Sequence, residues 1–285
     1  MVLRFSRFAA LLLASAVLPS CSPVDALNAS IQTDQLLIDH GIAYMDGPMG
    51  KLDVYRPATP QAEKLPLVIF IHGGAWKSGD RTQYRFVAAP LARAGVVVVV
   101  PDYRKVPEVH FPEFLADNAR AVAFAHAHAA EWGADPSRIF LIGHSAGGYN
   151  ALMLGLDPRY LAAVGLRSQD LAGVVGIAAP ADFLPSTDPD VIDAFGPSPD
   201  PALVQPIAFA AADAPPLLLL HGEKDNLVYP RNAVSLERHM RAVGGRVEVR
   251  RFADLGHIGI VTAFAPLFAW RAPVLDSVVS FIRSP

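Results

Sequence analysis

The stretch IFLIGHSAG, residues 139–147, decides the fold of this chain. Its first four residues are apolar and predict a buried strand over 139–143, and the residues after it predict a helix over 146–155. A serine between two glycines, Gly143-His144-Ser145-Ala146-Gly147, at a junction of strand and helix is the pattern of a nucleophile elbow. Gly143 and Gly147 allow the tight, strained turn that exposes a hydroxyl, so Ser145 is the candidate nucleophile.

Apolar runs alternate with helical patterns on both sides of this stretch, from about residue 40 to the end. This alternation predicts an α/β fold, a mostly parallel sheet with helices on both faces. We expect eight strands, near residues 42–44, 51–55, 67–71, 96–101, 139–143, 171–178, 217–221 and 247–252. We expect helices near residues 82–94, 111–132, 146–155, 232–243 and 266–282.

The chain of 285 residues is long enough for one large domain of this class. We assign that domain to residues 40–285 and interpret residues 22–39 as an N-terminal linker. The segment 181–216 is rich in proline and aspartate, which excludes one long helix, and it lies between two strong strands. We therefore expect a small cap inserted within a single domain.

Composition narrows the function classes. Apolar residues make up 52% of the chain and charged residues 18%, a balance that favours a compact core. The formal net charge is -3, and no run of Lys or Arg could follow a phosphate backbone, which argues against nucleic acid as a partner. The single cysteine, Cys21, excludes a disulfide within the chain.

The first 21 residues have the layout of a signal peptide. Arg4 and Arg7 precede an apolar run over residues 8–18, which is shorter than the roughly 20 residues of a membrane span. Leu18-Pro19-Ser20-Cys21 resembles a bacterial lipoprotein cleavage box. We therefore expect export and a lipid anchor at Cys21 on the periplasmic face of the envelope, at the outer membrane in a Gram-negative cell. An ordinary secretory signal cut near residues 26–30 is the alternative.

A second loop with two glycines, His72-Gly73-Gly74-Ala75-Trp76, begins where the expected strand 67–71 ends. Acyl transfer builds negative charge on a carbonyl oxygen, and backbone amides placed around that oxygen lower the barrier. We assign this role to the amides of Gly74, Ala75 and Ala146. His72 and Gly73 support the loop, and Trp76 is expected to line the pocket or to pack.

Two more loops that follow expected strands carry the candidate acid and the candidate base. Asp225 lies in His221-Gly222-Glu223-Lys224-Asp225, and His257 lies in the loop after the strand 247–252. The chain order Ser145, Asp225, His257 is the order expected for this fold. We expect His257 to accept the proton of Ser145 and Asp225 to orient His257. Glu223 is the rival acid.

The other polar candidates are interpreted as structural. His144 and His221 are expected to pack or to form hydrogen bonds, and Asp102 and Arg104 are expected to form an ion pair near the site. The two histidines in 126–128 face different sides of an expected helix. We therefore expect no metal site.

Segments 72–76, 133–148 and 221–225 together resemble the α/β-hydrolase superfamily of esterases and lipases. The tryptophan after His-Gly-Gly-Ala is similar to the carboxylesterase and feruloyl-esterase-like branch, which is related to kynurenine formamidase. The resemblance covers about residue 40 to the end. It implies a triad of Ser145, Asp225 and His257, no cofactor and a small-molecule ester substrate. One departure is Ala75, where hormone-sensitive-lipase relatives carry a third glycine.

The expected reaction is hydrolysis of a carboxylic ester through an acyl-enzyme on Ser145. An arylformamidase would use the same triad on a formamide and is the first alternative, although the expected export argues against it. An envelope protein that keeps this fold only to bind or to scaffold is the alternative from another class. Specificity lies in the pocket walls and the cap.

Overall fold

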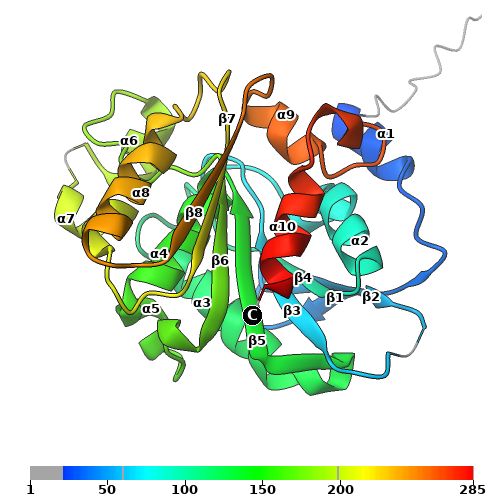
Figure 1. Ribbon diagram of the computed structural model, residues 1–285. Coiled ribbons are helices and arrows are strands. Elements are labelled where there is room, and N and C mark those ends of the chain that lie inside the picture. The colour runs from blue at the N-terminus through cyan, green and yellow to red at the C-terminus, as the bar shows by residue number, and fades with distance from the viewer. Residues whose placement is uncertain (1–21, 60, 198, 285) are drawn as a thin grey trace, which may run out of the picture.

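The computed structural model describes residues 22–59, 61–197 and 199–284. An eight-stranded sheet runs through its centre, with helices on both faces (Figure 1). The strands are β1 (Leu36–Ala43), β2 (Lys51–Pro57), β3 (Leu65–Ile71), β4 (Val97–Pro101), β5 (Ala134–His144), β6 (Leu171–Ile177), β7 (Leu217–Gly222) and β8 (Val247–Phe252). This confirms the expected α/β architecture.

Helices and short 3-10 turns connect the strands. The helices are α1 (Pro23–Ala29), α2 (Arg85–Arg93), α3 (Glu113–His128), α4 (Ala146–Leu156), α5 (Pro158–Ala162), α6 (Pro189–Phe195), α7 (Pro201–Val204), α8 (Arg231–Ala242), α9 (His257–Thr262) and α10 (Val274–Arg283). The 3-10 turns are η1 (Arg81–Tyr84), η2 (Ala129–Trp132), η3 (Ser168–Asp170), η4 (Pro206–Phe209) and η5 (Ala269–Arg271). Among the described residues, none of the helices has the length and apolar character needed to cross a bilayer.

The strand order is β1-β2-β4-β3-β5-β6-β7-β8. β2 runs antiparallel to both of its neighbours, and every other pair is parallel. From β3 the chain moves outward to β4 on one side and then returns to place β5 on the other side. A crevice forms outside the carboxyl ends of strands at such a reversal. The loops after β3 and β5, which carry His72 and Ser145, therefore open into the same crevice.

Alternate residues of the central strands serve two cores. In β3, Leu67 and Ile69 belong to the core on one face, and Val68 and Phe70 belong to the core on the other. The first core is completed by α3, α4, α5 and α8, and the second by α1, α2, α9 and α10. Because both faces are covered, the inner strands are apolar throughout, which is why they were recognisable in the sequence.

The interpretation of residues 22–39 as a linker is wrong. Ser22 caps α1 by accepting a hydrogen bond from the Asp25 amide, Pro23 occupies the first helical turn, and β1 pairs with β2 from Leu36 onward. β1 is an edge strand with a mixed burial pattern, so it lacks the continuous apolar run of the inner strands. The expected signal segment 1–21, with Cys21, lies outside the described residues.

The expected helix 266–282 is also wrong in its first half. Residues 266–273 form turns that include η5, and α10 begins only after Pro273. Proline has no amide proton and cannot continue a helix from the preceding turn. The segment 181–216, expected as a cap, contains α6, α7 and η4 and lies beside the carboxyl ends of the strands (Figure 1).

Candidate active site

Ser145 lies at the junction of β5 and α4 in a strained backbone conformation, with φ 56° and ψ -124°. The two flanking glycines are required by close backbone contacts. A Cβ on Gly143 would lie 2.1 Å from the Gly147 carbonyl oxygen, and a Cβ on Gly147 would lie 2.1 Å from the Ile71 carbonyl oxygen. The structure therefore forms the elbow that the sequence predicted, with Ser145 at the start of a helix whose amides favour negative charge.

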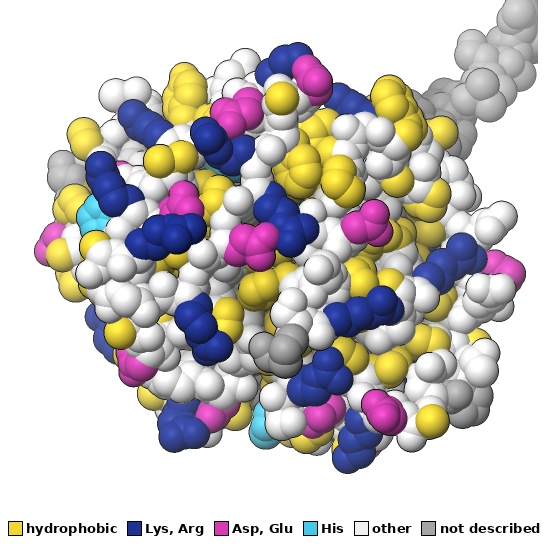
Figure 2. All heavy atoms as spheres, viewed as in Figure 1, with side chains coloured by type: hydrophobic (Ala, Val, Ile, Leu, Met, Phe, Trp, Pro, Cys, Tyr) yellow, Lys and Arg dark blue, Asp and Glu magenta, His cyan; other side chains and the backbone are white. Residues whose placement is uncertain are grey.

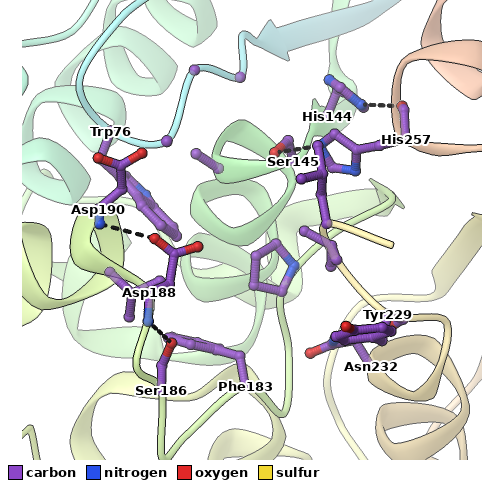
Figure 3. Close-up of a pocket in the computed structure, with 18 of the residues that line it drawn as sticks. Trp76, His144, Ser145, Phe183, Ser186, Asp188, Asp190, Tyr229, Asn232 and His257 are labelled. Carbon is purple, nitrogen blue, oxygen red and sulfur yellow. Dashed lines mark hydrogen bonds between the residues drawn. The ribbon is translucent and has the colours of Figure 1, made fainter. Parts of the chain in front are cut away.

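The structure brings Ser145, His257 and Asp225 into one hydrogen-bonded series (Figure 3 shows the first pair). His257 Nε2 lies 2.8 Å from Ser145 Oγ, and His257 Nδ1 lies 2.8 Å from Asp225 Oδ2. With Nδ1 donating to the carboxylate, Nε2 is free to accept the serine proton. Three strand ends, those of β5, β7 and β8, supply the segments that carry these residues.

Asp225 is held as an anion. Burial by itself raises the pKa of this carboxyl, but it is lowered more by His221, whose Nε2 lies 3.5 Å from Asp225 Oδ2, and by hydrogen bonds from His257 and the Val228 amide. The pKa therefore lies well below its usual range. The Leu227 amide also donates to Asp225, at 3.0 Å. A permanently charged carboxylate at this position stabilises a positive charge on His257.

The rival acid and one expected ion pair have other partners. Glu223 pairs with Arg251 at 3.0 Å and not with His257. The expected pair of Asp102 and Arg104 is wrong. Arg104 binds Asp117, and Asp102 binds Arg81, which also pairs with the buried Asp53. Asp102 and Arg104, which are close together in the sequence after β4, thus form ion pairs with different elements.

The loop after β3 turns its backbone toward Ser145. Ala75 and Trp76 adopt positive φ values of 52° and 55°, a left-handed conformation that is uncommon for residues other than glycine. Within the described residues, the amides of Gly74, Ala75 and Ala146 donate to no acceptor in the protein. All three residues line the same cavity as Ser145 and His257. These amides can therefore receive an oxyanion that forms beside Ser145.

The cavity has a volume of about 930 Å³. Ser145 and His257 line it, and another part of its wall comes from the cap segment, including Phe183, Asp188 and Asp190 (Figure 3). Within the described residues, no group of three or more His, Cys, Asp or Glu side chains is placed to hold a metal ion.

The BD-FAE family model matches residues 52–240. The chain belongs to the BD-FAE family. Esterase LipC of Mycobacterium tuberculosis is 32% identical over 224 residues, which are 71% of this chain and 55% of LipC. Isoprenylcysteine alpha-carbonyl methylesterase ICME of Arabidopsis thaliana is 24% identical over 273 residues, which are 87% of this chain and 62% of ICME. The chain thus spans little more than half the length of these curated relatives.

The fold of this BD-FAE family member is also found in solved structures. Esterase 2 of Thermogutta terrifontis, phosphorylated by paraoxon, superposes with a TM-score of 0.72 at 24% identity, covering 88% of this chain and 94% of that chain. At this identity the likeness establishes the shared α/β-hydrolase fold.

His144 and His221, expected to be structural, each hold part of the triad of this family member. The ring of His144 lies with its Nε2 3.0 Å from the His257 carbonyl oxygen (Figure 3). Burial, together with the charge that His257 can carry, lowers the pKa of His144 to about 3, so the ring is neutral and Nε2–H donates. His221 Nε2 donates to the Val228 carbonyl oxygen at 2.7 Å and fixes the turn that presents Asp225.

Sequence reasoning missed several residues that shape this BD-FAE site. Tyr84 accepts a hydrogen bond from the Gly73 amide at 3.2 Å, and burial raises its pKa to about 12. The Asn232 side chain accepts from the Ala181 and Asp182 amides, at 2.9 Å each. Such side-chain caps on loops depend on contacts between distant segments and leave no local pattern in the sequence.

Trp76 both lines the cavity and packs. It is 3% exposed, donates from Nε1 to Asn150 at 3.1 Å and makes an edge contact with Phe195 of α6. At the surface, Lys77 Nζ lies 3.1 Å from Asp190 Oδ1. The loop that offers the amides is thus tied to the first helix of the cap segment.

Proposed function

We propose that this protein is a serine hydrolase that cleaves small carboxylic esters through an acyl-enzyme on Ser145. The observation that carries the proposal is the series Ser145, His257 and Asp225 beside three amides that have no acceptor among the described residues. One cavity thereby holds a nucleophile, a base and a binding site for an oxyanion. Membership of the BD-FAE family and the esterase names of its relatives support the same reaction class.

The reaction has two halves. Ser145 Oγ attacks the ester carbonyl carbon while His257 Nε2 takes the hydroxyl proton, and the negative carbonyl oxygen is bound by the amides of Gly74, Ala75 and Ala146. The intermediate collapses, His257 gives its proton to the departing alcohol, and the acyl group stays on Ser145. A water molecule, deprotonated by His257, then attacks the acyl carbon. The bond to Ser145 Oγ breaks, His257 returns the proton to that oxygen, and the acid is released.

The test uses purified protein and p-nitrophenyl acetate. Replacing Ser145 with Ala should lower kcat by about 10⁴-fold or more, and a fluorophosphonate should add its mass to Ser145 in the wild type only. Ser186→Ala is the matched control, because Ser186 lines the same cavity at the cap and has no contact with His257. Equal turnover by wild type and Ser145→Ala would contradict the proposal. Faster cleavage of N-formylkynurenine than of any ester would identify a formamide, not an ester, as the substrate. A folded protein that the fluorophosphonate does not label would indicate a binding module.

The proposed location is the cell envelope, with a lipid on Cys21. The layout of residues 1–21 supports it, and Ser22, the first described residue, caps α1. Radioactive palmitate should label the wild type and not Cys21→Ala. Label that persists in this variant would contradict the anchor.

A further inference from the structure

The segment between α9 and α10 exposes a continuous apolar run. Residues Pro266-Leu267-Phe268-Ala269-Trp270 have no polar side chain. Trp270 is 82% exposed and Leu267 is 61% exposed. Surface runs of this length disfavour solubility and are typical of surfaces that bind an apolar partner. We call residues 266–270 the apolar run.

The apolar run is held firmly at its base. Phe264 and Val274, which flank it, are both fully buried, and the partly buried Phe268 packs against the second core. The turn η5 fixes the residues around Trp270. The exposed side chains are therefore presented by a packed segment.

The apolar run adjoins the mouth of the cavity. Arg271, directly after the run, lies against α9. Its guanidinium is so close to Gly259 of α9 that a Cβ added to this glycine would lie 3.4 Å from it. α9 begins with His257, and the next residue, Ile258, lines the cavity and is 60% exposed. Leu227, on the same cavity wall, is 68% exposed. Apolar side chains thus lie both on the run and at the opening that leads to Ser145.

The N-terminal end of the described chain lies at the same edge. α1 is fixed to η1 and α2 by Asn28, which donates to the Thr82 carbonyl oxygen and accepts from the Phe86 amide. α2 in turn contacts α9. Figure 1 shows α1, α9 and the segment after α9 together at the upper edge, and Figure 2 shows hydrophobic side chains on that part of the surface. Residue 22, the first that the structure describes, therefore lies on the side where the apolar run is exposed.

We propose that the apolar run, together with Ile258, inserts into the interface of a phospholipid bilayer. Tryptophan and leucine side chains suit that interface, where a ring can be half immersed, and the Arg271 guanidinium can reach lipid phosphates while its stem stays in the apolar layer. A lipid on Cys21 would hold this same edge against the membrane, and two such signals give stable attachment where one gives only marginal binding.

This orientation directs the cavity mouth toward the lipid. Esters dissolved in the bilayer would then enter beside Ile258 and Leu227 without crossing water. This consequence rests on the proposed function, whereas the binding of the apolar run to lipid does not require any catalysis.

Tryptophan fluorescence can test the insertion directly. The chain has three tryptophans, and Trp76 and Trp132 are only 3% and 9% exposed, so iodide in solution can reach Trp270 selectively. The full chain, purified as the cell makes it, is reconstituted into vesicles of phosphatidylethanolamine and phosphatidylglycerol. We expect protection of Trp270 from iodide and quenching by brominated lipid.

Two variants separate insertion from mere attachment. Leu267→Asp keeps Trp270 as the reporter and should lower the inserted fraction by about tenfold or more, since one buried leucine contributes roughly a factor of this size. Leu203→Asp on α7 replaces a leucine of 49% exposure in the cap segment and should behave as the wild type. Circular dichroism and thermal unfolding check that both variants are folded.

Two results would overturn the proposal. One is iodide access to Trp270 that vesicles leave unchanged in the wild type. The other is protection of Trp270 without lipid, in a protein that elutes as a dimer, which would assign the apolar run to a second copy of the chain. Turnover of a soluble ester by the wild type is measured in parallel, so a failure of the proposed function is visible independently of the fluorescence.

Discussion

Acidification should destabilise this fold through two buried histidines, His72 and His144. Burial, together with nearby positive charge from Lys105 beside His72 and from His257 beside His144, lowers the pKa of each from its ordinary 6.5 to about 3. His72 Nε2 and His144 Nδ1 have no hydrogen-bond partner within the described residues, so neither ring has an acceptor placed for a second proton. The folded protein therefore keeps both rings neutral.

The magnitude follows from proton linkage. In the unfolded chain both histidines bind protons as the pH falls below about 6.5, while in the fold they resist protonation down to about 3. Their stabilisation is complete above pH 6.5 and is lost progressively between 6.5 and 3, by about 1.4 kcal/mol per unit of pH and per histidine. From pH 7 to pH 5 we expect a loss of about 2 kcal/mol for each, or about 4 kcal/mol for the pair, out of a typical total of about 5–15 kcal/mol.

Urea unfolding at pH 7, 6 and 5 measures this effect. His144→Gln retains a side-chain N–H for the His257 carbonyl and cannot titrate, so its free energy of unfolding should fall by about 2 kcal/mol less than that of the wild type over this range. His239→Gln is the control, because His239 is exposed on α8. Equal losses in the wild type and in His144→Gln would refute the reasoning.

Three further substitutions probe the site. Asp225→Asn should lower kcat by about 10³–10⁴-fold, because the amide can stabilise the wrong tautomer of His257. In the same ester assay, Glu223→Gln should leave kcat nearly unchanged. A large loss of kcat in Glu223→Gln would identify Glu223 as the acid instead. Gly147→Ala should lower the free energy of unfolding, measured in urea, by about 3 kcal/mol or more, because its Cβ would lie 2.1 Å from the Ile71 carbonyl oxygen. A variant as stable as the wild type would contradict this contact. Ala75→Gly should relieve about 1–2 kcal/mol of left-handed strain at a cost of about 0.5–1 kcal/mol of chain entropy, so we expect a gain in stability of about 0–1.5 kcal/mol in urea unfolding and retained ester turnover. Loss of turnover would exclude the Ala75 amide as a simple donor.

Much of the fold was predictable because the inner strands are covered on both sides. Runs such as Leu217 to Leu220 must be apolar at every position when helices lie on both faces, and a run of this kind is visible without any structure. The edge strand β1 carries polar residues between apolar ones, and the prediction captured only its last residues. The expected helix 266–282 includes the exposed run before α10, because an apolar run has the same composition whether it is buried or exposed.

The candidate triad was predictable from chain order and from the positions of loops after strands, whereas its neighbours were not. Nothing local in the sequence joins Arg104 to Asp117 or Arg81 to Asp102 and Asp53. The two hydrogen bonds by which His144 and His221 hold the triad segments are likewise contacts that packing creates.

By itself the sequence determined the elbow at Ser145, the glycine loop at 72–76 and the acid and base at the ends of later strands. These features depend on backbone turns and on the period of a strand, which neighbouring residues encode. The tertiary structure alone decided that His257 Nε2 meets Ser145 Oγ at 2.8 Å across 112 positions of the chain, and that an apolar run lies beside the opening of their cavity. The physical reason is that strand order sets which loops adjoin, and strand order results from packing the whole sheet at once.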